Sequence, residues 1–360
     1  MNEKKRVLMA MSGGLDSSVA AILLQRQGYE VIGVTMKLWV FENPLMESSC
    51  CDTDAITDAH ILAGRLDIPH YVLDFTEDFK DIVVQDFVDE YLRARTPNPC
   101  ILCNINLKWK ALIKKAEELH CDYIATGHYA LIGQKNGRYF ISKGDDPKKD
   151  QSYVLWGLPQ EHLAKTLFPL GTYTKDVVRK MALDMGFERI ANKRESYDIC
   201  FIPDGDYRSF LQSQVTELEQ QCPAGNFIDT SGKIVGTHKG FPFYTIGQRK
   251  GLVVAFGTPK YVCKIDASNN EITLGDKEDL LSDTLIIRNY NLSKYDRIPD
   301  NFVGEVKIRY KDKGQLAAIG QHDDYILIKF QTPVSAITPG QSAVIYENDD
   351  VIAGGIIDLI

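Results

Sequence analysis

Apolar runs of strand length alternate with stretches of helical periodicity over roughly the first half of the chain. Buried strands are expected at 6–11, 31–36, 70–75 and 122–126, and helices at 17–27, 54–66, 77–93, 105–120 and 174–185. Strands that alternate with helices of this length are typical of βαβ units, whose right-handed crossovers build a parallel sheet. The pattern therefore predicts a doubly wound α/β layer that binds ligands at the carboxyl ends of its strands.

The pattern changes after residue 205, where glycine and proline become frequent and short β-rich runs replace the helices. These runs lie at 260–265, 271–274, 303–310, 325–330, 342–346 and 351–357. Regularly spaced short strands with turn residues between them predict small antiparallel barrels. We therefore expect three domains: an α/β domain over 1–205, a small central domain over 206–280 and a β-barrel over 281–360.

Composition limits the compartment and the class of protein. The chain has 360 residues, of which 44% are hydrophobic and 25% charged, as in globular proteins. It has no apolar run of about 18 residues and no signal-peptide pattern at its start, so we expect a cytoplasmic protein without a membrane partner. The net charge of −8 argues against a general nucleic-acid coat protein but leaves room for a local basic surface. In a reducing compartment the eight cysteines are not expected to be structural disulfides.

The segment 12–18 (SGGLDSS) joins the first predicted strand to the first predicted helix. Its glycines allow a sharp turn and a close backbone approach, and the helix start offers free N–H groups to a phosphate. No lysine follows the glycines, so this is not the GxxxxGK[ST] loop of ordinary NTPases. Asp16 would repel a phosphate on its own, and it is better explained as a ligand of a phosphate-bound Mg²⁺ ion. The competing interpretation is a plain glycine turn with a Ser or Asp cap.

Two further segments end predicted strands at the same edge of the sheet. Met36 offers a surface for an adenine ring, and 126–129 (TGHY) follows the strand that begins at Asp122. Taken alone, each is ordinary strand-end structure. We expect Asp16→Ala to abolish activity and to leave the fold intact, because the residue lies in a surface loop.

Cysteines form the second chemical signal. Two prolines precede a Cys-x-x-Cys pair in 96–104 (TPNPCILCN), Cys200 lies alone in 196–203 (SYDICFIP), and Cys50 and Cys51 form a third cluster. A Cys-x-x-Cys pair in a cytoplasmic protein indicates redox chemistry or metal binding. A structural zinc site is disfavoured because it needs a second pair of ligands. Cys121 and Cys263 are expected to be ordinary buried thiols.

In combination, these segments resemble the tRNA-specific 2-thiouridylases. The resemblance rests on the SGGLDSS loop, TPNP…CN, TGHYA, KDQSY at 149–153, the stretch around Cys200 and 236–250 (GTHKGFPFYTIGQRK), and it covers essentially the whole chain. It implies an adenine nucleotide alpha hydrolase-like N-terminal domain with a pyrophosphate loop, followed by a tRNA-binding central domain. It also implies ATP and Mg²⁺ as cofactors, and tRNA (the anticodon stem-loop) and a sulfur-donor protein as partners.

The resemblance also implies roles for individual residues. Cys103 matches the catalytic nucleophile and Cys200 the persulfide carrier, which pairs transiently with Cys103 in a disulfide. The segment Asn98, Pro99 and Cys100 matches the contact with the target base. ATP contacts are implied for Ala10, Met11, Ser12, Gly13, Gly14, Leu15, Asp16, Ser17, Met36 and Gly127. tRNA contacts are implied for His128, Lys149, Asp150, Gln151, Arg309, Tyr310 and Gln341.

The implied chemistry agrees with the residues. A uridine carbonyl is a poor electrophile, and adenylating its oxygen makes AMP the leaving group. A cysteine persulfide then supplies a strong sulfur nucleophile. The target base lies in a single-stranded loop, from which it can be splayed into a pocket. A basic stretch suits the tRNA backbone, although charge alone favours the solvated face of an alternating strand. The stretch comprises Lys307, Arg309, Lys311 and Lys313.

Cys100 departs from the family pattern, in which many members carry aspartate. Cys100, Cys103 and Cys200 could converge to hold three irons of a [4Fe–4S] cluster, although a full set of thiolate ligands is four. The alternative is a persulfide relay in which Cys100 is a bystander packed against the prolines.

Two other activities compete with tRNA thiolation. An amidotransferase-type synthetase of the same loop group would need an ammonia source, and no glutaminase domain is visible in the sequence. A redox-regulated RNA-binding protein would have no use for an intact pyrophosphate loop.

Overall fold

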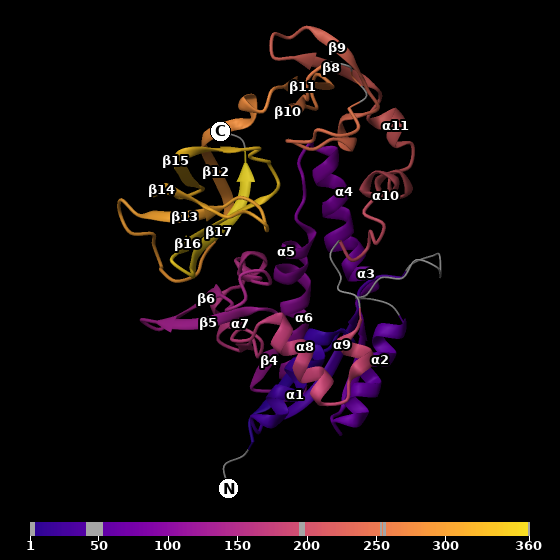
Figure 1. Ribbon diagram of the computed structural model, residues 1–360, viewed down its shortest axis with the longest axis vertical. Coiled ribbons are helices and arrows are strands. Elements are labelled where there is room, and N and C mark those ends of the chain that lie inside the picture. Colours follow the sequence, from indigo (N-terminus) through magenta and orange to yellow (C-terminus); the bar gives the residue numbers. More distant parts are fainter. Residues whose placement is uncertain (1–3, 41–52, 194–198, 253, 255–256, 359–360) are drawn as a thin grey trace.

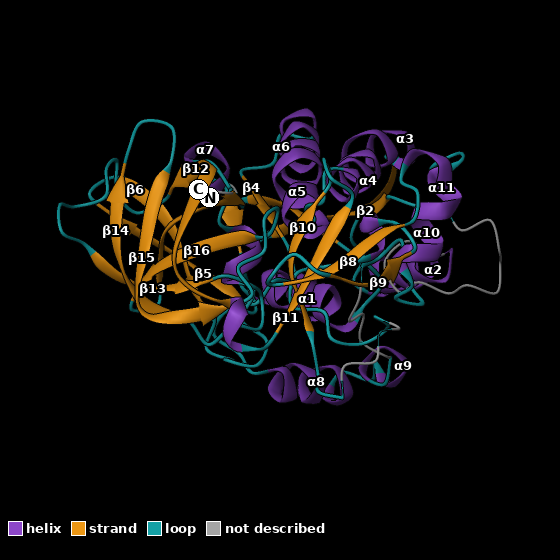
Figure 2. Cartoon of the chain, turned by 90° about the horizontal axis from the view of Figure 1, so that it is seen from above, coloured by secondary structure: helices purple, strands orange, loops and turns teal. Residues whose placement is uncertain are grey.

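The computed structural model describes residues 4–40, 53–193, 199–252, 254 and 257–358. Figure 1 shows an elongated molecule in three parts: an α/β layer near the N-terminus, a small sheet with two helices at the far end, and a β-barrel beside them. Seen along the perpendicular direction in Figure 2, the barrel strands gather on one side of the molecule and most helices on the other.

A five-stranded parallel sheet forms the centre of the first part, as the alternating pattern predicts. In spatial order its strands are β3 (His70–Asp74), β2 (Glu30–Lys37), β1 (Arg6–Ala10), β4 (Tyr123–Ala125) and β7 (Thr166–Leu167). Met9 pairs with Gly33 on one side and with Ala125 on the other. The carboxyl ends of β1, β2 and β4 therefore meet at one edge, where α/β sheets bind ligands.

Helices cover both faces of this sheet. One face carries α1 (Leu15–Arg26), α2 (Thr53–Arg65), α8 (Lys175–Asp184) and α9 (Glu188–Ala191), and the other carries α6 (Trp109–Glu118). Val7 and Met9 of β1 belong to the first core, and Leu8 belongs to the second. This division follows from the alternation of side chains along a strand.

Two predicted helices are interrupted by π-helical turns. The helix expected at 77–93 consists of α3 (Thr76–Phe79), the π-turn η1 (Lys80–Val84) and α4 (Gln85–Leu92). The helix expected at 105–120 begins six residues earlier, with α5 (Pro99–Cys103) and the π-turn η2 (Asn104–Lys108) before α6. Pro99 occupies the first turn, where its missing N–H costs nothing, so the Cys-x-x-Cys pair is helical.

The central part is a four-stranded sheet flanked by α10 (Tyr207–Gln214) and α11 (Leu218–Gln221). Its order is β10 (Tyr261–Asp266), β11 (Glu271–Gly275), β8 (Gly225–Asp229) and β9 (Ile234–His238). The β11–β8 pair is parallel. The core of this part is continuous with the apolar face of α4, through Phe87 and Tyr91 on one side and Phe227 and Val262 on the other.

Six antiparallel strands form the closed C-terminal barrel: β12 (Leu281–Leu292), β13 (Val303–Lys307), β14 (Gln315–Gln321), β15 (Ile326–Ser335), β16 (Ser342–Glu347) and β17 (Asp350–Asp358). Pairing of β12 with β17 closes the ring. The strand expected at 303–310 ends at Lys307, and a turn contains the remaining basic residues. Interpreting 307–313 as one face of an alternating strand is therefore wrong.

A hairpin of β5 (Ala130–Lys135) and β6 (Arg138–Lys143) reaches from the α/β layer to the barrel, where Ser142 pairs with Asp350. Short helical turns complete the fold: α7 (Gln160–Leu163), η3 (Ser152–Leu155), η4 (Phe241–Phe243) and η5 (Glu278–Leu280). Within the described residues, no helix is long and apolar enough to cross a membrane.

Candidate active site: a phosphate loop and two cysteines

The loop at 12–18 folds as a tight turn between β1 and α1. Gly13 has a φ of +64°, and a Cβ atom built there would lie 2.0 Å from the carbonyl oxygen of Ala55, so only glycine fits. The Oγ atom of Ser17 accepts a hydrogen bond from the Ser12 N–H at 3.1 Å. Ser18 Oγ donates to the Gly14 carbonyl at 2.7 Å. The loop is thus held by its own serines, with the N-terminus of a 12-residue helix behind it.

The expected nucleotide residues meet around this loop. A Cβ atom on Gly127 would lie 2.8 Å from the backbone nitrogen of Ser17, so the turn after β4 packs directly on the loop. The Met11 N–H donates to the Val34 carbonyl at 2.8 Å, and the Thr35 hydroxyl donates to the Met11 carbonyl at 2.8 Å. Met36 follows on β2, at the same edge. The structure therefore brings the ends of three strands together beside α1.

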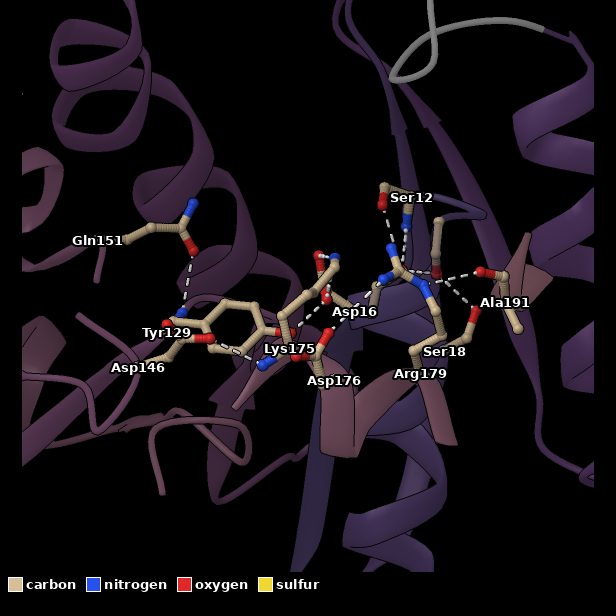
Figure 3. Close-up of polar contacts among 12 residues, drawn as sticks. Ser12, Asp16, Ser18, Tyr129, Asp146, Gln151, Lys175, Asp176, Arg179 and Ala191 are labelled. Carbon is tan, nitrogen blue, oxygen red and sulfur yellow. Dashed lines mark hydrogen bonds and ion pairs between the residues drawn. The ribbon is translucent and has the colours of Figure 1, made fainter. Parts of the chain in front are cut away.

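Asp16 is bound by Tyr129, the last residue of the TGHY segment, and by Lys175, which sequence reasoning missed. Lys175 Nζ, at the start of α8, donates to both carboxylate oxygens at 2.8 Å, and the Tyr129 hydroxyl donates to Oδ1 at 2.7 Å (Figure 3). Only 9% of the Lys175 side chain is exposed. The loop has no lysine of its own, but the fold supplies one from 159 residues further along the chain.

A second charged group touches the same loop. Lys193 Nζ donates to the Gly13 carbonyl at 3.3 Å and to Asp58 Oδ2 at 2.9 Å. Arg189 lies 3.2 Å from the other oxygen of Asp58, whose side chain is 5% exposed. Two cations from the α8–α9 region, Lys175 and Lys193, thus approach the turn in which phosphates are expected. The sequence offers only a weak signal for Lys175. Thr174 is a helix cap whose side chain accepts the Val177 N–H, which places Lys175 in the first turn of α8.

The two cysteines expected to react share one apolar core. Cys103 ends α5 and is 4% exposed, and Cys200 is half-buried against the same cluster. Their surroundings include Phe79, Phe87 and Phe201. Cys222 is buried in this cluster as well, a feature that the sequence did not reveal. Tertiary packing therefore places Cys103 and Cys200, about 100 positions apart in sequence, in one cluster.

The remaining cysteines differ in exposure. Cys100 lies on the outer side of α5 and is exposed, while Cys121 and Cys263 are half-buried. Burial raises the pKa of the Cys121 thiol to about 11, which suits an inert structural thiol. Cys50 and Cys51 lie outside the described residues.

The described residues contain no preformed site for the Mg²⁺ ion or for the iron–sulfur cluster considered above. Among the residues that the structure describes, no group of three His, Cys, Asp or Glu side chains is arranged to hold a metal ion. Cys100, Cys103 and Cys200, all within the described part of the chain, do not form such a group. At the loop, Asp16 is engaged by Lys175. The two carboxylate oxygens of Asp16 lie beside the expected phosphate position. They fit a Mg²⁺ ligand if Lys175 releases them.

The residues expected to contact tRNA lie in three places. The Asp150 carboxylate is hydrogen-bonded to nearby backbone: it accepts the N–H groups of Gly144 and Ser152 at 3.2 and 3.0 Å. Gln151 Oε1 accepts the Tyr129 N–H at 2.9 Å. On the barrel, Arg309 and Tyr310 are exposed in the turn after β13. The barrel turn lies beside the 149–153 segment: Lys307 Nζ is 3.9 Å from Asp150 Oδ2, and the ring centroid of Tyr310 is 6.2 Å from that of Tyr153.

Gln341 connects the barrel to the cysteine segment. Its Nε2 donates to the carbonyl oxygens of Thr96 and Pro97 at 3.2 and 2.8 Å, and the Thr96 N–H donates to the Pro339 carbonyl at 2.9 Å. Beside it, Arg95 makes an ion pair with Asp358 at 2.6 Å. The barrel thus supports the chain immediately before Asn98 and Pro99.

His128 remains neutral in this environment. Its Nδ1 lies 2.7 Å from the Thr126 hydroxyl, and its ring centroid lies 5.6 Å from that of Trp109. Burial, with a smaller contribution from Lys108, lowers the pKa of His128 to about 3. A phosphate contact through a positive charge is therefore not available to this side chain near neutral pH.

Comparison with known proteins identifies the family. Three family models match in succession: a "tRNA methyl transferase HUP domain" over residues 5–204, a "tRNA methyl transferase PRC-barrel domain" over 208–276 and an "aminomethyltransferase beta-barrel domain" over 282–357. A solved 4-thiouridine synthetase bound to RNA and ATP is 17% identical over 60% of this chain and 52% of its own. Its TM-score of 0.38 is too low to carry an argument.

Full-length relatives are much closer. The tRNA-specific 2-thiouridylase MnmA of Amoebophilus asiaticus is 49% identical over 98% of this chain and 95% of its own length. The proteins of the same name from Salinibacter ruber and Cytophaga hutchinsonii are each 48% identical over 99% of this chain, and over 94% and 98% of their own lengths. Identity at this level across all three parts leaves no room for a different family: the chain belongs to the tRNA-specific 2-thiouridylases.

Proposed function

We propose that the protein is a tRNA sulfurtransferase that converts the wobble uridine of certain tRNAs to 2-thiouridine in the cytoplasm, using ATP. The observation that carries the proposal is the pairing of two sites in one chain. A phosphate loop held by Ser12, Ser17 and Ser18 lies in the same domain as Cys103, and Cys200 packs on the same core as Cys103. Thiolation of a tRNA uridine, the reaction for which the family is named, needs both sites.

ATP activates the base in this account. The C2 carbonyl oxygen of uridine attacks the α-phosphorus of ATP, the bond to the β-phosphate breaks, and pyrophosphate leaves. The N–H groups at the start of α1, with Lys175 and Lys193, stabilise the negative charge on the phosphates. Mg²⁺ bound to the phosphates would neutralise further charge, with Asp16 as its protein ligand. The product is an O-adenylated uridine whose leaving group is AMP.

Sulfur arrives on Cys200 as a persulfide. Its outer sulfur attacks C2 and AMP leaves, which gives a base joined to Cys200 through a sulfur–sulfur bond. The Cys103 thiolate then attacks the Cys200 sulfur, breaks that bond and releases 2-thiouridine, leaving a Cys103–Cys200 disulfide. A two-electron thiol reductant restores both thiols, and a sulfur-donor protein reloads Cys200. The half-buried position of Cys200 supports this role, because the carrier must meet both the donor and Cys103.

tRNA binds across the three parts in this account. Asn98 lies at the N-cap of α5, which begins with the buried Pro99 and the exposed Cys100, and the splayed base would enter here, beside Cys103. Arg309 and Tyr310 of the barrel and Lys149 of the neighbouring turn would hold the anticodon stem-loop, with Gln341 supporting the backbone before Asn98.

Nucleoside analysis tests the proposal. tRNA from cells that lack the protein should contain no 2-thiouridine derivative at the wobble position, and the wild-type gene should restore it. A gene in which Cys103 is replaced by alanine should not. Normal 2-thiouridine in the deletion strain would overturn the proposal.

A further inference from the structure

Asp146 is a buried aspartate outside the phosphate loop. It connects that loop to the turn that contains Lys149, Asp150 and Gln151, the residues expected to contact tRNA. It lies after β6, and only 8% of it is exposed. Its Oδ2 accepts the backbone N–H of Lys175 at 2.9 Å, and its Oδ1 accepts that of Lys148 at 3.0 Å. Its own carbonyl accepts the N–H groups of Lys149 and Asp150 at 3.0 and 2.8 Å. One residue therefore holds the first residue of α8 and the turn at 148–150 together.

Gln151 makes a second connection from the same turn. Its N–H donates to the Tyr129 carbonyl at 2.8 Å, and its Oε1 accepts the Tyr129 N–H at 2.9 Å. The Tyr129 hydroxyl in turn donates to Asp16. Figure 3 shows both arms arriving at Asp16: Asp146 through Lys175, and Gln151 through Tyr129.

The two arms connect an exposed turn to buried side chains. Pro147 and Lys148 at the tip of the turn are exposed, while Asp146, Tyr129 and Lys175 behind it are buried. Buried polar contacts of this kind transmit a displacement because a close-packed interior does not absorb it. A ligand that moves the turn at 147–151 would therefore act on the backbone of Lys175 through Asp146 and on that of Tyr129 through Gln151.

We propose that Asp146 is a positioning residue that couples tRNA binding at 149–151 to nucleotide binding at the phosphate loop. This inference rests on the proposed function, which supplies the tRNA contact and the ATP site. Without tRNA, Lys175 and Tyr129 hold the Asp16 carboxylate. Contact of the tRNA backbone with Lys149 shifts the turn, and Asp146 carries the shift to Lys175, so that Asp16 becomes available to the metal-bound nucleotide.

Linkage provides the test, since coupling between two ligands is reciprocal and is measured as a ratio of affinities. The affinity of the full-length protein for Mg²⁺ with α,β-methylene-ATP is measured by calorimetry, with and without a saturating tRNA transcript that has uridine at the wobble position. The wild type should bind the analogue about tenfold more tightly with tRNA, within the usual range for coupled sites. Asp146→Ala should reduce this ratio several-fold, because it removes the carboxylate bonds to Lys148 and Lys175 and leaves only the arm from Gln151 to Tyr129.

Two further variants make the result decisive. Tyr129→Phe removes only the hydroxyl on Asp16 and keeps the buried ring, and it should reduce the ratio several-fold. Asp122→Ala is the matched control: its carboxylate also accepts a backbone N–H, that of Arg6 at 2.7 Å, at the opposite edge of the sheet. The control should keep the wild-type ratio.

A purely structural role for Asp146 would weaken each ligand's binding and leave the ratio unchanged. An unchanged ratio in Asp146→Ala or Tyr129→Phe, or a ratio of one in the wild type, overturns the inference. Failure of the proposed function has a different signature, because the wild type would then form no AMP and no 2-thiouridine from ATP and tRNA.

Discussion

Lys175 and Asp16 form a two-point ion pair: the ammonium nitrogen lies 2.8 Å from each carboxylate oxygen, although the residues are 159 positions apart. The pair joins the start of α8 to the phosphate loop. It also changes the expectation for Asp16, because the carboxylate in this surface loop is a structural partner of a buried lysine.

Asp16→Asn and Lys175→Met should each reduce AMP formation by at least about 100-fold, since each removes a charge that the transition state needs. Asp16→Ala should also lower the free energy of unfolding, by on the order of 1 kcal/mol, because the ion pair is only partly buried. Product analysis with labelled ATP measures the first effect, and urea unfolding measures the second. Wild-type rates in Lys175→Met would exclude a role for this lysine in phosphate chemistry.

Cys103→Ala and Cys200→Ala should each stop repeated thiolation while leaving AMP formation detectable. Alanine is preferable to serine at the buried Cys103 and the half-buried Cys200, because a buried hydroxyl without a partner is destabilising. Cys222→Ala is the matched control, as this thiol is 5% exposed in the same core. Multiple turnovers by Cys200→Ala with a protein sulfur donor would contradict the relay.

Cys100→Asp should keep full activity, because the proposed relay uses only the thiols of Cys103 and Cys200. Protein purified without oxygen should contain no stoichiometric iron and should thiolate tRNA with a persulfide donor. Iron with charge-transfer absorption, lost together with activity in Cys100→Asp, would favour the [4Fe–4S] alternative instead.

Lys149→Met should weaken tRNA binding and reduce the slope of log affinity against log salt by about 0.7 to 0.9, the value of one phosphate contact.

His128→Asn should leave the slope of log affinity against log salt unchanged between pH 6 and 8, because a pKa of about 3 keeps His128 neutral there. The sign for stability follows from the same shift. A histidine buried in its neutral form destabilises the fold as the pH falls from its ordinary pKa of 6.5 towards 3, and His128→Asn should remove that dependence. Binding titrations and acid unfolding measure these effects.

Local sequence patterns predicted the parallel sheet and the tight turn at 12–18, because both depend on contiguous residues. The alternation of Val7, Leu8 and Met9 between two cores is visible as an apolar run, and only glycine fits at Gly13. The strands β8 and β9 were not predicted, because most of their residues are only half-buried or exposed. Their buried positions are Phe227 and His238.

Long-range contacts were beyond sequence reasoning. Nothing near Lys175 in the sequence points to Asp16, and the hairpin β5–β6 pairs with a strand about 200 residues away. Cys103 was predicted from its motif, but its 4% exposure and its shared core with Cys222 depend on how α4 meets the central sheet. Such contacts depend on tertiary packing rather than on local propensity.

A single-turnover experiment tests the central claim most directly. Protein loaded with radioactive sulfur from a low-molecular-weight persulfide is mixed with Mg-ATP and a tRNA transcript, and all products are counted. The account predicts one labelled 2-thiouridine, one AMP and one pyrophosphate for each Cys103–Cys200 disulfide found by peptide mapping. ADP and phosphate as products, or labelled 2-thiouridine formed without that disulfide, would contradict it.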